Sequence, residues 1–209
     1  MAVFWRLFFA HLLADFTFQT GAVNRWKRAS GWGMLLHCAT HLAASIILTY
    51  PYLNSYWVDI NIVKLKGWAC VLLIALLHYA EDEWRIFAIK KFRTADGTLH
   101  FLWDQFIHAG IIFAFSPVIG FQLNGSFFPE KWAVLGCLFV GVTHALTVFV
   151  YFIEKDFYKS GFPRFDEQYL IMAQRVVLWL FFLVPGYGWL PYFFLWLLQQ
   201  THLHVLNLM

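Results

Sequence analysis

Charged residues are scarce in this sequence. They make up 13% of its 209 residues, whereas hydrophobic residues make up 61%. A soluble domain usually carries about a quarter of its residues as charges, so the composition predicts a membrane protein. The formal net charge of +3 is small, and no run of basic residues alternates with aromatic ones. The sequence therefore argues against a nucleic-acid partner.

Cysteine is also scarce. Cys38, Cys70 and Cys137 lie singly in apolar segments, so the sequence predicts neither a disulfide framework nor a CxxC metal site. A P-loop, a dinucleotide-binding fingerprint and a recognisable nucleophilic triad are absent as well. These absences leave the histidines and aspartates as the main candidates for chemistry.

Long apolar runs are abundant and predict membrane spans. The expected spans are 2–19, 33–53, 67–88, 99–121, 132–153, 169–185 and 190–206. Each has about the length that crosses a bilayer, although the sequence VPGYGWLP at 184–191 leaves open whether the last two are spans or a re-entrant pair. We expect an all-α integral membrane protein of about six or seven transmembrane helices. It would form a single domain over 1–209, with a polar four-helix core in 1–121 and additional helices in 132–206.

Basic residues predict the orientation of these spans. The first, third and fifth connections are rich in Lys and Arg, whereas the even-numbered connections carry only Lys64, Lys66 and Lys131. Basic connections stay in the cytoplasm. The amino terminus is therefore expected outside, with membrane lipids as the surrounding partners.

Histidine and aspartate form four pairs with a spacing of four residues. The pairs are His11 and Asp15, His37 and His41, His78 and Asp82, and Asp104 and His108. Residues four apart share one helix face. Each pair has one member about five residues from the cytoplasmic end of its span and one about nine, or roughly 8 and 14 Å deep at the helical rise. This predicts a deeper layer of His11, His41, His78 and His108 and a shallower layer of Asp15, His37, Asp82 and Asp104.

Imidazole and carboxylate ligands suit a divalent metal. Zinc is the foremost candidate, with manganese or iron as alternatives, and the eight paired residues are enough for two ions. Five further polar residues could orient these ligands or extend the polar face: Gln19, His100, Gln105, His144 and Arg175. Taken singly, His144 is more typical of a hydrogen bond between helices, and Arg175 of an ion pair with an acidic neighbour.

The motifs resemble those of a bacterial inner-membrane family known as domain of unknown function 3307. They are HLLADFTFQ from residue 11, LLHCATH, LLHYAED and FLWDQFIH. The family pattern is HLxxDFxxQ, a histidine in the second span, HxxxD in the third and DQxxH in the fourth, and the likeness covers about residues 5–115. The matching positions are His11, Asp15, Gln19, His37, His78, Asp82, Asp104, Gln105 and His108. The resemblance implies a multi-pass inner-membrane protein without an assigned activity, and Glu81 departs from the family pattern.

Three classes of function fit this constellation. The first is a metal-dependent hydrolase acting on a lipid or membrane-associated substrate, in which Asp15, Asp82 and Asp104 divide metal ligation and general-base catalysis. An oxygen-activating di-iron enzyme is a variant of it. The second is a transporter or channel for divalent cations or protons. The third is a structural or signalling component with a buried polar network, possibly in a homo-oligomer.

Overall fold

The computed structural model describes residues 1–60, 62–117, 128–159, 161–162, 165–182, 190–191 and 193–194. The chain divides into two compact units, Met1–Gly161 and Phe162–Met209. The second unit contains α8 (Phe165–Phe182). Most of the predicted last span and most of the break at 184–191 lie outside the described residues.

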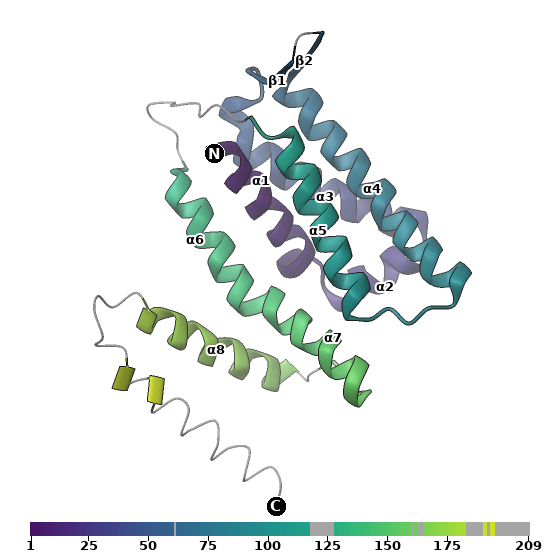
Figure 1. The fold of residues 1–209 in the computed structure, drawn as a ribbon, viewed down its shortest axis with the longest axis vertical. Helices are drawn as coiled ribbons and strands as arrows, with labels where there is room; N and C mark the ends of the chain where they lie inside the picture. Colours follow the sequence, from purple (N-terminus) through teal and green to yellow (C-terminus); the bar gives the residue numbers. More distant parts are fainter. Residues whose placement is uncertain are drawn as a thin grey trace, which may run out of the picture. The chain divides into compact units, whose positions relative to one another are not determined.

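The first unit is mostly helical (Figure 1). Its amino-terminal part consists of α1 (Ala2–Leu12), a π-helical turn (Leu13–Phe18), α2 (Gly21–Ala29), α3 (Gly31–Thr49) and a short 3-10 turn (Tyr50–Tyr52). A hairpin of β1 (Tyr56–Ile60) and β2 (Val63–Lys66) leads into α4 (Gly67–Phe92) and α5 (Thr98–Phe115). The last helix consists of α6 (Glu130–Val140), a π-helical turn (Gly141–Ala145) and α7 (Leu146–Tyr158).

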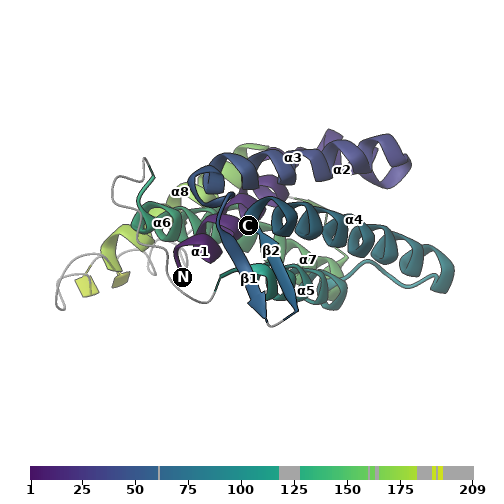
Figure 2. The same ribbon diagram turned by 90° about the horizontal axis from the view of Figure 1, so that it is seen from above.

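Four of these helices form an antiparallel bundle. Helix α1 packs against α3 and α5, and α4 packs against the same two helices. Seen from above, α3 and α5 lie on opposite sides of α1 and α4 (Figure 2). The hairpin lies at one end of this bundle, and α2 lies at the other end with the connection between α4 and α5 (Figure 1). We call these the hairpin end and the α2 end.

The bundle carries apolar side chains on its outer surface and polar ones in one part of its interior. Ile47, Leu76 and Phe106 are 61%, 64% and 71% exposed on α3, α4 and α5. On the same helices, His37 and Asp82 are 1% and 2% exposed. A water-soluble bundle shows the opposite distribution, with an apolar stripe facing its core.

Two helices among the described residues are long and apolar enough to cross a membrane. They are Gly31–Tyr52 and Glu130–Tyr158. The prediction of six or seven spans is not supported, because the other helices are shorter or more polar than their apolar runs indicated. Helix α1 itself ends at Leu12, and α4 includes the sequence EDEWR at 81–85, which lowers its hydropathy.

The hairpin corrects the prediction of an all-α fold. Strands β1 and β2 pair antiparallel, with Ile60 opposite Val63 and Val58 opposite Leu65. This segment, YWVDINIVKLK, alternates β-branched or large apolar residues with polar ones, as strands do. The sequence predicts this segment only as a connection between the expected spans 33–53 and 67–88, because the segment is too short to cross a membrane.

The hairpin end of the bundle has an apolar core. Its fully buried residues include Val3, Leu7, Leu53, Val71 and Ile112, which come from α1, α4, α5 and the segment before the hairpin. The indole of Trp57 closes this core and donates a hydrogen bond of 2.9 Å to the carbonyl oxygen of Tyr52. This end of the bundle is therefore held by ordinary packing, and the polar residues lie nearer the α2 end.

Candidate metal centre

The four predicted pairs converge inside the bundle. His11 lies in the last turn of α1, and Asp15 lies in the π-helical turn that follows it. His37 and His41 lie on α3, His78 and Asp82 on α4, and Asp104 and His108 on α5. All eight side chains belong to residues that are at most 9% exposed. We call them the His/Asp cluster.

Asp15 connects three helices of the bundle. Its Oδ1 lies 3.0 Å from His41 Nε2 and 3.3 Å from His37 Nε2. Its Oδ2 lies 3.5 Å from His11 Nε2 and accepts a hydrogen bond of 3.3 Å from Gln105 Nε2. The π-helical turn widens the helix at Asp15, a distortion that occurs frequently at functional sites.

Four imidazoles form a compact layer. The ring centroids of His41 and His78 are 3.8 Å apart, and those of His78 and His108 are 4.1 Å apart. His11 lies 5.3 Å from His41 and 5.2 Å from His108. All four line one cavity of about 20 Å³, and they are the four histidines that depth counting places in the deeper layer.

Apart from Ser45, the remaining walls of this cavity are apolar. They include Leu7, Leu42, Val71, Ile74 and Ile111. A volume of this size holds about one water molecule. The imidazole layer therefore separates a small apolar chamber, on the side of the hairpin end, from the carboxylates on the side of the α2 end.

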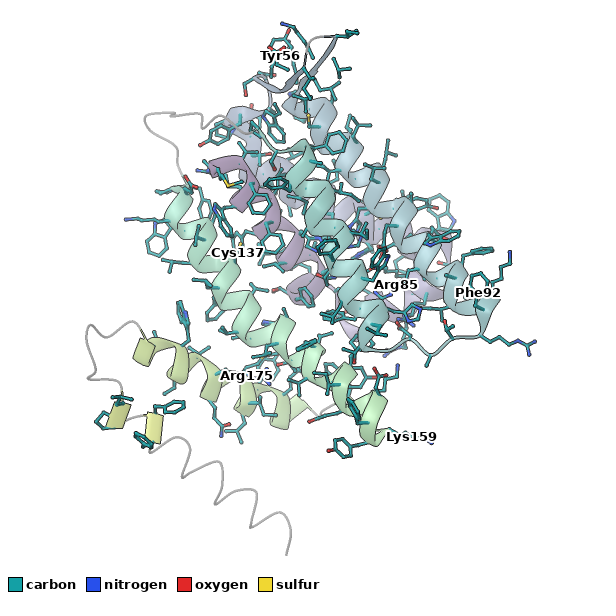
Figure 3. The ribbon with its side chains drawn as sticks, viewed as in Figure 1. Tyr56, Arg85, Phe92, Cys137, Lys159 and Arg175 are labelled. Carbon is teal, nitrogen blue, oxygen red and sulfur yellow. The ribbon has the colours of Figure 1, made fainter. Side chains whose placement is uncertain are left out.

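Basic side chains neutralise two of the carboxylates. Lys27 on α2 donates a hydrogen bond of 2.8 Å to Asp82 Oδ1. Arg85, on the side of α4 that faces α5 (Figure 3), lies 3.0 Å from Asp104 Oδ2 and 2.9 Å from Asp96 Oδ1. The Lys27 and Arg85 side chains are only 11% and 15% exposed, so these pairs are largely shielded from water.

A glycine allows α2 to approach the bundle closely. A Cβ atom on Gly33 would lie 2.4 Å from the carbonyl carbon and oxygen of Trp26. At the same corner, Ser30 caps α3 by accepting a 3.1 Å hydrogen bond from the amide of Gly33. This tight corner holds α2, and with it Lys27, against the cluster.

The connection between α4 and α5 carries a further ion pair. Asp96 contacts both Arg85 and Arg28. Burial opposes ionisation of Asp96, but the two guanidinium groups outweigh it and hold the pKa of this carboxyl below its ordinary value. The α2 end is thus tied together by charges that reach from α2 to α5.

Of the five residues expected to orient ligands, Gln105 lies within the cluster. Its Nε2 donates to Asp15 Oδ2 at 3.3 Å and to Asp104 Oδ2 at 3.0 Å. Its Oε1 lies 3.3 Å from His11 Nε2. Gln105 therefore links α5 to α1.

The other four lie elsewhere. Gln19 follows the π-helical turn after Asp15. His100 contacts Thr94 at 3.5 Å, and His144 contacts its neighbour Thr143 at 3.0 Å. None of the groups of possible metal ligands in the described part of the chain includes these residues. Arg175 lies on α8, in the second compact unit.

Sequence reasoning missed three charged residues and a thiol. Glu81 Oε2 lies 3.1 Å from His108 Nε2. Lys27 lies in one of the basic connections that predict the orientation of the spans. Arg85 lies four residues after Glu81, a spacing that is typical of a shared helix face. Cys38, which belongs to no CxxC motif, offers a ligand atom within 4.8 Å of those of His78 and Asp82.

Two groups of possible ligands share no residue. The nitrogen-rich set consists of Asp15, His37, His41 and His78, and the oxygen-rich set consists of Glu81, Asp82, Asp104 and His108. Within each set, one ligand atom per residue lies within 4.8 Å of those of the others. Such groups have the composition of known sites for divalent metals.

The fold and this site define a helical-bundle protein with a buried His/Asp cluster. Over residues 3–135, which contain the entire cluster, the chain matches the model of the family described as protein of unknown function DUF3307. The chain belongs to that family, and the resemblance seen in the motifs is confirmed. No curated protein and no solved structure matches it. Its function must therefore be argued from the site itself.

Proposed function

We propose that the protein is a membrane-embedded, metal-dependent hydrolase that acts on a lipid or a membrane-associated substrate. The observation that carries the proposal is the burial of the His/Asp cluster inside a bundle whose outer surface is apolar. Intramembrane ionisable residues are costly, and where they occur they usually serve a function.

The membrane part of the proposal rests on the outer surface of the bundle. Exposed apolar side chains such as Ile47, Leu76 and Phe106 suit contact with lipid, and two helices have the length and composition of a span. The α2 end carries Arg25, Lys27 and other basic residues. Multiple spans in the bacterial inner membrane, with the α2 end facing the cytoplasm, fit this distribution.

The nitrogen-rich set is the proposed site of the catalytic metal. Catalytic zinc takes three protein ligands and keeps a fourth position for water, so the three imidazoles are the proposed ligands, with Asp15 beside that fourth position. In the structure, the Nε2 atoms of His37 and His41 both face Asp15 Oδ1, at 3.3 and 3.0 Å. His78 Nε2 lies 3.3 Å from His37 Nε2. These atoms therefore converge on a small volume between α1, α3 and α4.

Hydrolysis follows from the groups around this set. Bound zinc would supply an activated water and polarise a carbonyl or phosphoryl oxygen. Asp15 Oδ1 lies 3.0 Å from His41 Nε2 and 3.3 Å from His37 Nε2, and we assign it the role of accepting a proton from that water. Lys27 holds Asp82 Oδ1 and thereby orients this carboxylate beside His37 and His78.

A closed pocket fits the surroundings better than a transport path. Beyond the imidazole layer the cavity is walled by Leu7, Val71, Ile74 and other apolar side chains, with Ser45 as a single polar residue. A path for ions would need polar groups that continue toward the hairpin end. The same end instead contains the apolar core around Leu53 and Trp57.

Zinc content and lipid hydrolysis together test the proposal. The full chain is purified, its zinc is measured by mass spectrometry, and it is reconstituted in nanodiscs of phosphatidylethanolamine and phosphatidylglycerol. We expect bound zinc and released fatty acid or headgroup, both lost in His41→Ala. Thr40→Ala is the matched control, because Thr40 is the neighbouring residue and its hydroxyl donates a hydrogen bond to the carbonyl oxygen of Leu36 on the same helix.

Two results would contradict the proposal. One is protein that binds no zinc although it is folded. The other is zinc-loaded protein that leaves these lipids intact but carries zinc into liposomes, which would favour transport.

A further inference from the structure

We infer that the oxygen-rich set, Glu81, Asp82, Asp104 and His108, is a second cation site next to the nitrogen-rich set. It is suited to a hard divalent cation such as Mn²⁺ or Mg²⁺. This site goes beyond the proposed function and does not depend on zinc binding or on hydrolysis, since the two sets share no residue.

Helices α4 and α5 present the four ligands together. Glu81 and Asp82 are consecutive on α4, and Asp104 and His108 lie one turn apart on α5. One ligand atom from each residue lies within 4.8 Å of those of the other three. Because α4 and α5 pack directly against each other, the set is assembled by two neighbouring helices.

Buried atoms without hydrogen-bond partners gather in this set. In the described part of the chain, such atoms include Glu81 Oε2, Asp82 Oδ2, Asp104 Oδ1 and both ring nitrogens of His108. The side chains of Asp82, Asp104 and His108 are only 3%, 5% and 2% exposed. Buried polar atoms normally find a partner, so this concentration points to a ligand that binds all four residues.

The close contacts within the set do not remove this need. His108 Nε2 is 3.1 Å from Glu81 Oε2, yet neither atom has the geometry of a hydrogen bond. Two ligand atoms of one cation lie about 3 Å apart when each is roughly 2.1 Å from the metal, and these ion-pair contacts have similar distances. The same applies to Asp82 Oδ2, which lies 3.3 Å from His78 Nε2 without a hydrogen bond.

The charge of the set also favours a cation. Glu81, Asp82 and Asp104 contribute three negative charges, and their partners Lys27 and Arg85 contribute two positive ones. An imidazole that ligates a metal is neutral, so in the loaded site the three carboxylates exceed the two basic groups by one negative charge, which the cation offsets. The two basic groups occupy Asp82 Oδ1 and Asp104 Oδ2 and leave the other oxygens for a metal.

The ligand chemistry indicates the kind of cation. Three carboxylates and one imidazole form a harder donor set than three imidazoles and one carboxylate, and carboxylates suit Mg²⁺ and Mn²⁺. Asp82, a member of the oxygen-rich set, also faces the nitrogen-rich set, because its Oδ2 lies close to His37 and His78. Two different metals side by side are therefore the expected state of the loaded protein.

Manganese binding to zinc-loaded protein tests the second site. The full chain in detergent is stripped with a chelator, loaded with one equivalent of zinc and titrated with Mn²⁺, while free Mn²⁺ is followed by electron paramagnetic resonance. We expect one further Mn²⁺ to bind per chain. Glu81→Gln should weaken this binding at least about tenfold, the equivalent of 1.4 kcal/mol, while zinc content stays unchanged.

Glu83→Gln is the matched control, because Glu83 carries the same charge on the same helix but belongs to neither set. It should leave Mn²⁺ binding unchanged, and retained zinc reports that each variant is folded. Wild-type protein that takes up no Mn²⁺ would overturn the inference, as would a Glu81→Gln variant that binds Mn²⁺ as well as wild type. Protein that binds Mn²⁺ but not zinc would contradict the proposed function and leave the second site standing.

Discussion

The two ends of the helical bundle are built from the same helices but are held together differently. At the hairpin end, Val3, Leu7 and Ile112 pack as an ordinary apolar core. Toward the α2 end, the same helices bury histidines and carboxylates, with Lys27 and Arg85 as the basic partners. Apolar packing depends on shape, whereas the polar end depends on charges that neutralise one another.

This difference separates stability from function. A substitution that removes a methyl group from the apolar core at the hairpin end lowers the free energy of unfolding by an amount that depends on the cavity left behind. A charge removed from the polar end leaves a partner unpaired in a buried position, which costs more. Substitutions at the two ends should therefore differ both in magnitude and in their effect on bound metal.

The largest effect is expected for Arg85→Met. The variant leaves Asp104 Oδ2 without its cation and removes one of the two guanidinium groups at Asp96. Breaking a buried pair costs roughly 3–5 kcal/mol, to be measured as a lower midpoint of thermal unfolding in detergent. Arg25→Met removes the same charge from an exposed position on α2 and should change little. Equal midpoints for the two variants would show that the polar end does not depend on this pair.

A smaller effect is expected for Leu7→Ala in the apolar half. Leu7 is 1% exposed and lines the cavity beside the imidazoles, so the free energy of unfolding should fall by about 2–4 kcal/mol. Bound metal should be retained once the protein is folded. Leu36→Ala, at a position 46% exposed, should change stability by less than about 0.5 kcal/mol. Loss of metal from folded Leu7→Ala protein would contradict the claim that the hairpin end affects stability but not metal binding.

Gly33→Ala should disturb the corner that joins α2 to the bundle. The new methyl group would meet the backbone of Trp26, and such overpacking costs about 1–3 kcal/mol. Because Lys27 follows Trp26, metal affinity should fall as well. Gly31→Ala is the control, since a Cβ at Gly31 meets nothing within 4 Å. If both alanine variants behave alike, the close approach is not what holds α2.

The smallest effect concerns the pH dependence of the ion pair at Asp96. Its pKa in the folded state is lower than the ordinary value of 3.8, so the pair stabilises the fold above that pH. This contribution is lost as pH falls through the folded-state pKa, below 3.8. The difference in unfolding midpoint between wild type and Asp96→Asn should therefore be constant near neutral pH and shrink under acid conditions. A difference that grows on acidification would contradict the assigned direction.

The sequence predicts much of the polar end and less of the rest. A spacing of four puts His11 and Asp15, or Asp104 and His108, on one helix face, and counting from the basic connections indicates their depth. The partner Lys27 could not be foreseen, because it approaches the cluster through the corner at Gly33. Whether the cluster binds metal stays a prediction.

The hairpin shows the limit of reasoning from hydropathy. Long apolar runs indicate helices well, but the segment Tyr56–Lys66 is short and was treated as a connection. Its strands depend on pairing between Ile60 and Val63 and between Val58 and Leu65. Hydropathy alone also predicts too many spans. Helix α1 ends at Leu12, within the first apolar run, and the charged residues of α4 lower the hydropathy of the third.

X-ray absorption spectroscopy of the zinc-loaded full-length protein tests the central claim most directly. The nitrogen-rich set predicts an extended fine structure of zinc bound by about three imidazoles and one oxygen, at distances near 2.0–2.1 Å. A sulfur ligand near 2.3 Å would place the metal at Cys38 instead and contradict this assignment. Folded protein that retains no zinc for the measurement would contradict the claim that the cluster is a metal centre.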